Sequence, residues 1–91
     1  MNNDMTIRDP YAMESFAKEV DDYITSMNIV CNKLKSDLSS AKPYMKDRVS
    51  SKAIINVENF VDNILKTLPI ASDASDKLKR SAKVLKRAKT L

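Results

Sequence analysis

Apolar and small residues recur at alternating steps of three and four along both halves of this chain. In the first half these residues are Met13, Phe16, Val20, Tyr23, Met27, Val30 and Leu34. In the second half they are Ile54, Val57, Val61, Ile64, Leu68, Ala71, Ser75, Leu78, Ala82 and Leu85. This spacing places each set on one face of a helix. It predicts an all-α chain with two long amphipathic helices that pair as an antiparallel hairpin.

The start of the first helix is marked by Asp9 and Pro10. An aspartate accepts hydrogen bonds from the unpaired N–H groups of a first turn, and proline suits the first helical position. We therefore expect a helix over residues 10–39, preceded by a disordered segment over residues 1–9.

A proline also marks the turn between the helices. Pro43 disfavours the helical conformation at the residue before it. We expect a short turn over residues 40–43 and a second helix over residues 44–88, with the whole chain forming one domain. Pro69 lies inside the second helix, where proline costs about 3 kcal/mol. Because the spacing passes Pro69 without a slip, we favour a kinked but nearly continuous helix; a break near 68–73 is the alternative.

A second apolar row runs beside the first on the initial helix. Its members are seven residues apart: Ala17, Ile24, Cys31 and Leu38. A lone hairpin would leave this row partly exposed, and an exposed apolar strip usually marks an interface. We expect the hairpin to pair with a helical protein partner, or with a second copy, as a four-helix bundle. The residues expected to hold hairpin and partner together are Phe16, Val20, Ile24, Met27, Cys31, Leu38, Val61, Ile64 and Leu68.

The composition argues against catalysis. The chain has no glycine, no histidine and one cysteine. Without glycine it cannot build the phosphate-binding loops and strained turns that many enzymes use. Without histidine it lacks the commonest general base and metal ligand. We expect a non-enzymatic interaction protein with no cofactor and no metal site.

The positive charge is concentrated at the C-terminal end. Residues 75–91 carry seven basic groups and one acidic group. The basic tail comprises Lys77, Lys79, Arg80, Lys83, Lys86, Arg87 and Lys89. Three interpretations remain open: compensation of the helix dipole, docking on an acidic partner, and association with nucleic acid or an anionic membrane. The absence of aromatic residues beyond Phe60 disfavours both nucleic acid and membrane.

Acidic residues cluster on the first helix. The cluster consists of Glu14, Glu19, Asp21 and Asp22. We expect it to be a solvated helix face in which Glu14 pairs with Lys18, four residues further on.

The sequence also bears on localisation. No apolar run approaches the roughly 20 residues that a membrane span requires, and residues 1–8 lack the apolar stretch of a signal peptide. We expect a cytoplasmic protein and leave open its export together with a partner.

The two-helix pattern resembles the WXG superfamily of small proteins that serve type VII secretion in Gram-positive bacteria. The local match is strongest from Val57–Phe60 through Leu78 and Leu85, with small residues at Ala71, Ala74 and Ala82. The superfamily's W-x-G turn is absent, and Ala41-Lys42-Pro43-Tyr44 stands in its place. Its export motif, a tyrosine followed four residues later by an acidic residue, is absent too.

The resemblance implies a role in which a partner carries the export signal. The chain is then similar to the small accessory proteins, or targeting chaperones, that bind the helical N-terminal domain of LXG-type toxins. The partner implied is such a toxin domain, with a second small helical protein as a further member of the complex.

Overall fold

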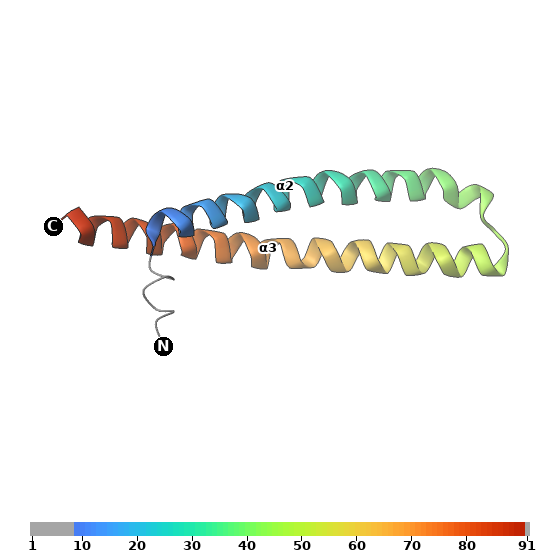
Figure 1. Ribbon diagram of the computed structural model, residues 1–91. Coiled ribbons are helices and arrows are strands. Elements are labelled where there is room, and N and C mark those ends of the chain that lie inside the picture. Colours follow the sequence, from blue (N-terminus) through green and yellow to red (C-terminus); the bar gives the residue numbers. More distant parts are fainter. Residues whose placement is uncertain (1–8, 91) are drawn as a thin grey trace. The chain divides into compact units, whose positions relative to one another are not determined.

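The computed structural model of the chain describes residues 9–90 and, for the last two of these, the backbone alone. Helix α2 spans Pro10–Ala41, a short 3-10 helix η1 spans Lys42–Tyr44, and helix α3 spans Arg48–Thr90 (Figure 1). No strand occurs among residues 9–90. The predicted all-α fold with two long helices is confirmed. The disorder expected for residues 1–8 lies outside the described residues.

Helix α2 begins where the sequence predicts. One carboxylate oxygen of Asp9 accepts hydrogen bonds from the N–H groups of Tyr11 and Ala12, at 2.9 and 3.3 Å. The carbonyl of Asp9 accepts a third, from the N–H of Met13 at 3.1 Å. The capping role predicted for Asp9 is therefore confirmed, and only its assignment to the segment expected to be disordered is wrong.

The turn lies further along the chain than predicted. Helix α2 continues to Ala41, and Pro43 sits in η1 rather than in the first turn of the next helix. Helix α3 begins at Arg48 and not at residue 44. The physical reason is Asp47, whose carboxylate accepts a 3.0 Å hydrogen bond from the N–H of Ser50. A helix that began at residue 44 would have Pro43 at its N-cap, and proline has no side-chain oxygen that could accept a hydrogen bond from the first turn.

Helix α3 passes through Pro69 without interruption. The alternative of a break near residues 68–73 is therefore wrong. Pro69 lies on the exposed side of the helix, where its ring takes no space from the apolar contacts. Just before it, the hydroxyl of Thr67 donates a 2.6 Å hydrogen bond to the carbonyl of Ile64.

The chain divides into two compact units. Of the described residues, we call 9–24 with 70–90 the terminal unit, and residues 25–69 the turn unit. In the terminal unit, Glu14 pairs with Lys86 and Asp21 with Lys79. Because the paired residues advance along one helix as they retreat along the other, the two helical segments are antiparallel.

The turn unit is a helical hairpin in its own right. The end of α2 and the beginning of α3 are joined by η1 and the following loop (Figure 1). Lys35 pairs with Asp62 at 3.6 Å, and Lys42 pairs with Glu58 at 2.6 Å. These pairs have the same antiparallel order as those of the terminal unit.

The seam between the helices, meaning the faces through which they contact each other, follows the predicted row on α3. Its buried members are Ile54, Val61, Leu68, Ser75 and Ala82. Its half-buried members are Ile64, Ala71, Leu78 and Leu85. Only Val57 departs from the predicted row, with 38% of its surface exposed.

On α2 the seam differs from the prediction. Phe16, Tyr23 and Val30, expected inside, are 56%, 53% and 45% exposed. The second row, expected to remain partly exposed, supplies the closest contacts instead, since Ala17 and Cys31 are fully buried. The helix is thus rotated so that small side chains lie in the seam and aromatic ones lie beside it. The other seam residues of α2 are half-buried: Met13, Val20, Ile24, Met27, Leu34 and Leu38.

Candidate interaction surfaces

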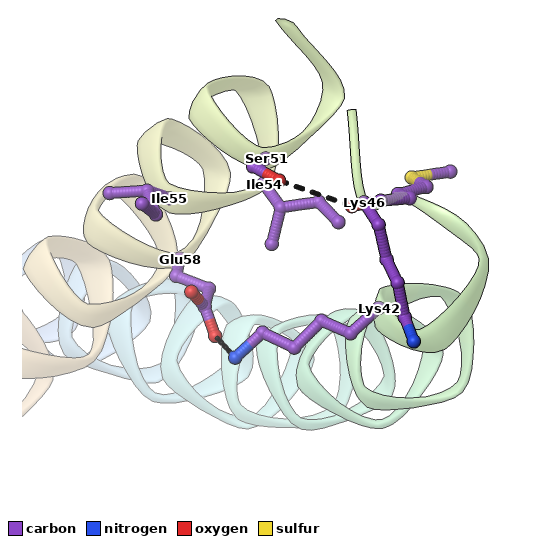
Figure 2. Close-up of a pocket in the computed structure, with 7 residues that line it drawn as sticks. Lys42, Lys46, Ser51, Ile54, Ile55 and Glu58 are labelled. Carbon is purple, nitrogen blue, oxygen red and sulfur yellow. Dashed lines mark hydrogen bonds and ion pairs between the residues drawn. The ribbon is translucent and has the colours of Figure 1, made fainter. Parts of the chain in front are cut away.

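A hollow of about 440 Å³ lies beside the turn in the turn unit (Figure 2). Its apolar walls come from Met45, Ile54 and Ile55. Lys42 closes one side through its ion pair with Glu58, and Lys46 lies at another edge. The hollow is therefore apolar inside and basic at its edge. The remaining lining residue is Ser51, whose hydroxyl donates to the carbonyl of Met45 at 3.3 Å.

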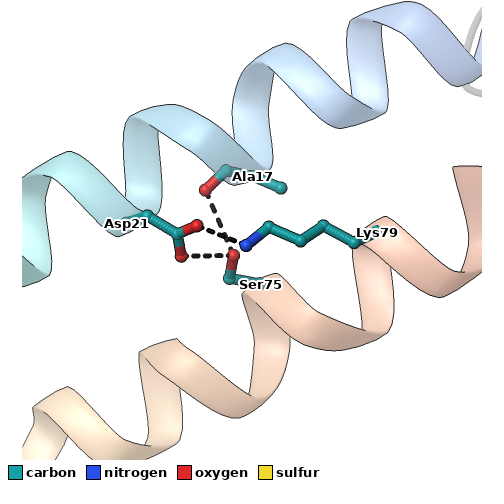
Figure 3. A network of polar contacts seen from close by, with 4 residues as sticks. All are labelled: Ala17, Asp21, Ser75 and Lys79. Atoms are coloured by element: carbon teal, nitrogen blue, oxygen red, sulfur yellow. Dashed lines mark hydrogen bonds and ion pairs between the residues drawn. The ribbon is translucent and has the colours of Figure 1, made fainter.

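The terminal unit contains a polar network between its helices (Figure 3). The hydroxyl of Ser75 lies 2.6 Å from one carboxylate oxygen of Asp21 and 3.1 Å from the carbonyl oxygen of Ala17. The ammonium of Lys79 donates to the other carboxylate oxygen of Asp21 at 2.5 Å. The hydrogen bond from Lys79, and secondarily that from Ser75, lowers the pKa of Asp21. In return Asp21 raises the pKa of Lys79.

A second ion pair lies nearer the end of the terminal unit. The ammonium of Lys86 donates to the carboxylate of Glu14 and stands 4.6 Å from the ring centre of Tyr11. The predicted pairing of Glu14 with Lys18 is therefore wrong. Lys86, on the other helix, interacts with the ring of Tyr11 as well as with the carboxylate of Glu14. A pair with the exposed Lys18 would offer Glu14 the ion pair alone.

These contacts occupy a large part of the basic tail. Besides Lys79 and Lys86, Lys77 pairs with Asp73 at 3.0 Å, and Arg87 is engaged as well. Arg80 and Lys83 are exposed, while the side chain of Lys89 lies outside the described part. Two cations of the tail, Lys79 and Lys86, are therefore internal counterparts of acidic residues on α2. The sequence carried this signal in its spacing, since Glu14 and Asp21 are seven residues apart, as are Lys79 and Lys86.

The other side of the terminal unit carries no such charges. Phe16 and Tyr23 flank the seam opposite Glu14 and Asp21 on the helical wheel of α2. On α3 the equivalent positions are Ala74 and Ser81, and all four residues flanking the seam are exposed. We call these four residues the uncharged face.

A groove deepens the uncharged face. Its volume is about 500 Å³, and it is lined by Met13, Arg80, Ser81, Val84 and Leu85. Val84 is 62% exposed. The groove is apolar apart from Ser81 and one cation, and its size suits one or two inserted apolar side chains.

The turn unit has the same two-sided character. Its interhelical ion pairs, from Lys35 and Lys42, lie on one side of its seam. On the other side lie Val30, 45% exposed, and Phe60, 61% exposed. Ala53 and Thr67 occupy the same row as Phe60 at seven-residue intervals.

The predicted interface residues mostly contribute to the contact between the chain's own helices. Cys31, Val61 and Leu68 are buried in the seam. Half-buried beside them are Val20, Ile24, Met27, Leu38 and Ile64. Only Phe16 of that set is exposed enough to contact another molecule broadly. Sequence reasoning missed Val30 and Phe60 as exposed surface, although the uncharged seven-residue row of Ala53, Phe60 and Thr67 was a usable signal for Phe60.

Other kinds of site are not found in the described part of the chain. No group of three or more cysteine, aspartate or glutamate side chains among residues 9–88 is placed so that it could hold a metal ion. Within the described helices, no stretch is both long and apolar enough to cross a bilayer.

Comparison with known proteins adds no relative. No protein-family model matches the chain, and neither curated proteins nor solved structures gave a match.

Proposed function

We propose that this chain is a non-enzymatic interaction protein whose uncharged face binds the helices of another protein and completes a four-helix bundle. The observation that carries the proposal is the contrast between the two sides of the terminal unit. One side is occupied by ion pairs within the chain. The other exposes Phe16 and Tyr23 beside an apolar groove.

The energetics favour the uncharged face as the contact. Burying a large apolar side chain contributes about 1.5–3 kcal/mol, and the only charged residue that lines the groove is Arg80. Aromatic residues set in apolar surroundings are typical centres of binding energy. Covering the opposite side would desolvate Asp21 and Lys79, which already bond to each other.

The resemblance to the WXG superfamily supports a narrower form of the proposal. In that form the partner is the helical N-terminal domain of an LXG-type toxin, and the chain acts as a targeting chaperone for type VII secretion. A homodimer is the other form, in which a second copy covers the same face. The basic tail, as a site for nucleic acid or anionic membrane, ranks below both because Lys77, Lys79 and Lys86 are paired within the chain and the tail itself contains no aromatic residue.

The test compares substitutions on two faces of α2. Phe16→Ser and Tyr23→Ser should abolish association, while Ile29→Ser should not, because Ile29 is 65% exposed on the outer side of the same helix. Light scattering after size exclusion measures self-association, and co-purification with an LXG-type toxin domain measures the hetero-complex. Thermal unfolding verifies that all three variants remain folded. If the Phe16 and Tyr23 variants associate as well as the Ile29 variant, the assigned face is wrong.

A further inference from the structure

The turn end of the turn unit exposes apolar side chains to an unusual degree. Tyr44 is 88% exposed, Val49 is 79% exposed and Met45 is 42% exposed. These three residues lie within six positions of one another in the sequence. Neither Tyr44 nor Val49 lines the neighbouring hollow, so their exposed surface lies outside it. We call residues 42–52 the tip.

The same segment carries uncompensated positive charge. Lys46, Arg48 and Lys52 are exposed, and none of the ion pairs formed among the described residues includes them. The tip has one acidic residue, Asp47, and its carboxylate is engaged by the N–H of Ser50. Three exposed cations therefore alternate in sequence with the exposed apolar side chains, and none of the three is part of an ion pair among the described residues.

We propose that the tip binds an anionic lipid surface. Tyrosine suits the headgroup layer because its ring is apolar and its hydroxyl is wet. Valine and methionine add apolar surface that enters the boundary of the acyl chains, while lysine and arginine are attracted to anionic headgroups. The proposal goes beyond the pairing described above, since it uses none of the residues of the uncharged face.

One comparison separates the tip from the basic tail, and a second favours lipid over a protein as the occupant. In the tail, Lys79 and Lys86 are paired within the chain, and the ring next to Lys86, that of Tyr11, already interacts with its ammonium. An acidic protein would be expected to exploit the shaped hollow, yet the most exposed apolar residues, Tyr44 and Val49, stand outside it. A fluid surface requires no shape complementarity from Tyr44 and Val49.

Vesicle flotation of the full chain tests the proposal. Vesicles of phosphatidylcholine mixed with phosphatidylserine should retain the protein, vesicles of phosphatidylcholine alone should not, and added salt should weaken retention. Lys46→Gln and Lys52→Gln should each lower the partition coefficient about fivefold. Tyr44→Ser combined with Val49→Ser should lower it further.

Matched controls separate the tip from other surfaces. Arg80→Gln combined with Lys83→Gln removes two exposed cations of the tail and should leave retention unchanged. Ile29→Ser removes an exposed apolar side chain elsewhere and should also have no effect. Equal unfolding temperatures establish that the variants are folded. The proposal is overturned if the tip variants bind like the unaltered chain, if the tail variant loses binding, or if the protein binds polyglutamate but no vesicle.

Discussion

The hydroxyl of Ser75 lies 2.6 Å from a carboxylate oxygen of Asp21, across 54 residues of sequence. Ser75 is fully buried and occupies a position that is apolar one heptad earlier, at Leu68, and one heptad later, at Ala82. A buried hydroxyl without a partner is costly, so its hydrogen bond must be kept for the helices to pack. The contact thus favours the one alignment of α2 with α3 in the terminal unit that places Ser75 next to Asp21.

Replacing Ser75 with alanine tests this contact. The substitution removes the hydrogen bond without adding volume, so we expect a loss of about 1 kcal/mol in unfolding free energy. For a chain of this size that corresponds to a fall of roughly 4–8 °C in Tm. Ser72→Ala, at an exposed position on the same helix, should change Tm little. Equal Tm values for the two variants would show that the buried hydroxyl does not matter.

The stability should depend on pH through Asp21. Its pKa is held below its ordinary value of 3.8, first by Lys79 and then by Ser75. A depressed pKa means that the contribution to stability is fully present above the unfolded pKa and is lost as pH falls through the folded pKa. Asp21→Asn should therefore flatten the decline of Tm below about pH 4, an effect that Asp22→Asn should not reproduce. A parallel decline in the Asp21→Asn variant and the unaltered chain would contradict the assignment.

In alkaline solution the stability should depend on pH with the opposite sign, through Lys79. Asp21 raises the pKa of Lys79 above its ordinary value of 10.5. The contribution of Lys79 is then fully present below pH 10.5 and is lost as pH rises through the folded pKa. As pH rises above 10.5, Tm should fall less steeply for Lys79→Gln than for the unaltered chain. The control variant Lys83→Gln should behave like the unaltered chain.

The ion pair between Glu14 and Lys86 can be tested by exchanging its charges. Glu14→Lys alone places two cations together and should lower Tm, and the addition of Lys86→Glu should restore most of the loss. The effect should stay below about 1 kcal/mol because the pair is partly exposed, and it should shrink in high salt. Failure of the second substitution to restore Tm would mean that the two side chains do not interact.

Two adjacent isoleucines offer a matched test of the seam. Ile54 is 6% exposed and Ile55 is 53% exposed. Ile54→Ala should cost about 2–5 kcal/mol because it leaves a cavity between the helices, while Ile55→Ala should stay within about 0.5 kcal/mol. Urea unfolding measures both losses. Similar losses would place the seam elsewhere on α3.

The sequence predicted the face of α3 almost completely because the row of Ile54, Val61 and Leu68 carries large aliphatic side chains. The neighbouring row, which contains Ala53, Thr67 and Ala74, holds mainly small residues apart from Phe60. On α2 two such rows lie side by side, and spacing alone cannot choose between them. The row with Phe16 was assigned to the seam and the row with Ala17 to the partly exposed strip. The structure buries Ala17 instead, which lets its carbonyl oxygen approach Ser75.

Contacts between distant parts of the chain were the least predictable feature. The helix start at Arg48 depends on a local cap, and Asp47 could have been recognised as that cap from the sequence. The pairing of Glu14 with Lys86 depends on which way the helices face and how they are aligned. The periodicity of one helix determines neither its rotation toward the other helix nor the alignment of the two along their length. Sequence reasoning therefore treated the acidic cluster and the basic tail as separate surfaces.

The burial of Cys31 gives the molecule a chemical reporter. It is the only cysteine of the chain, and 1% of its surface is exposed. A thiol reagent can reach its sulfur only when α2 and α3 separate in the turn unit, so the rate of labelling measures how often they open. Cys31, which fills the seam as a small apolar side chain, thus also reports the rate at which the two helices separate there. The measurement uses the unaltered protein and needs no added probe.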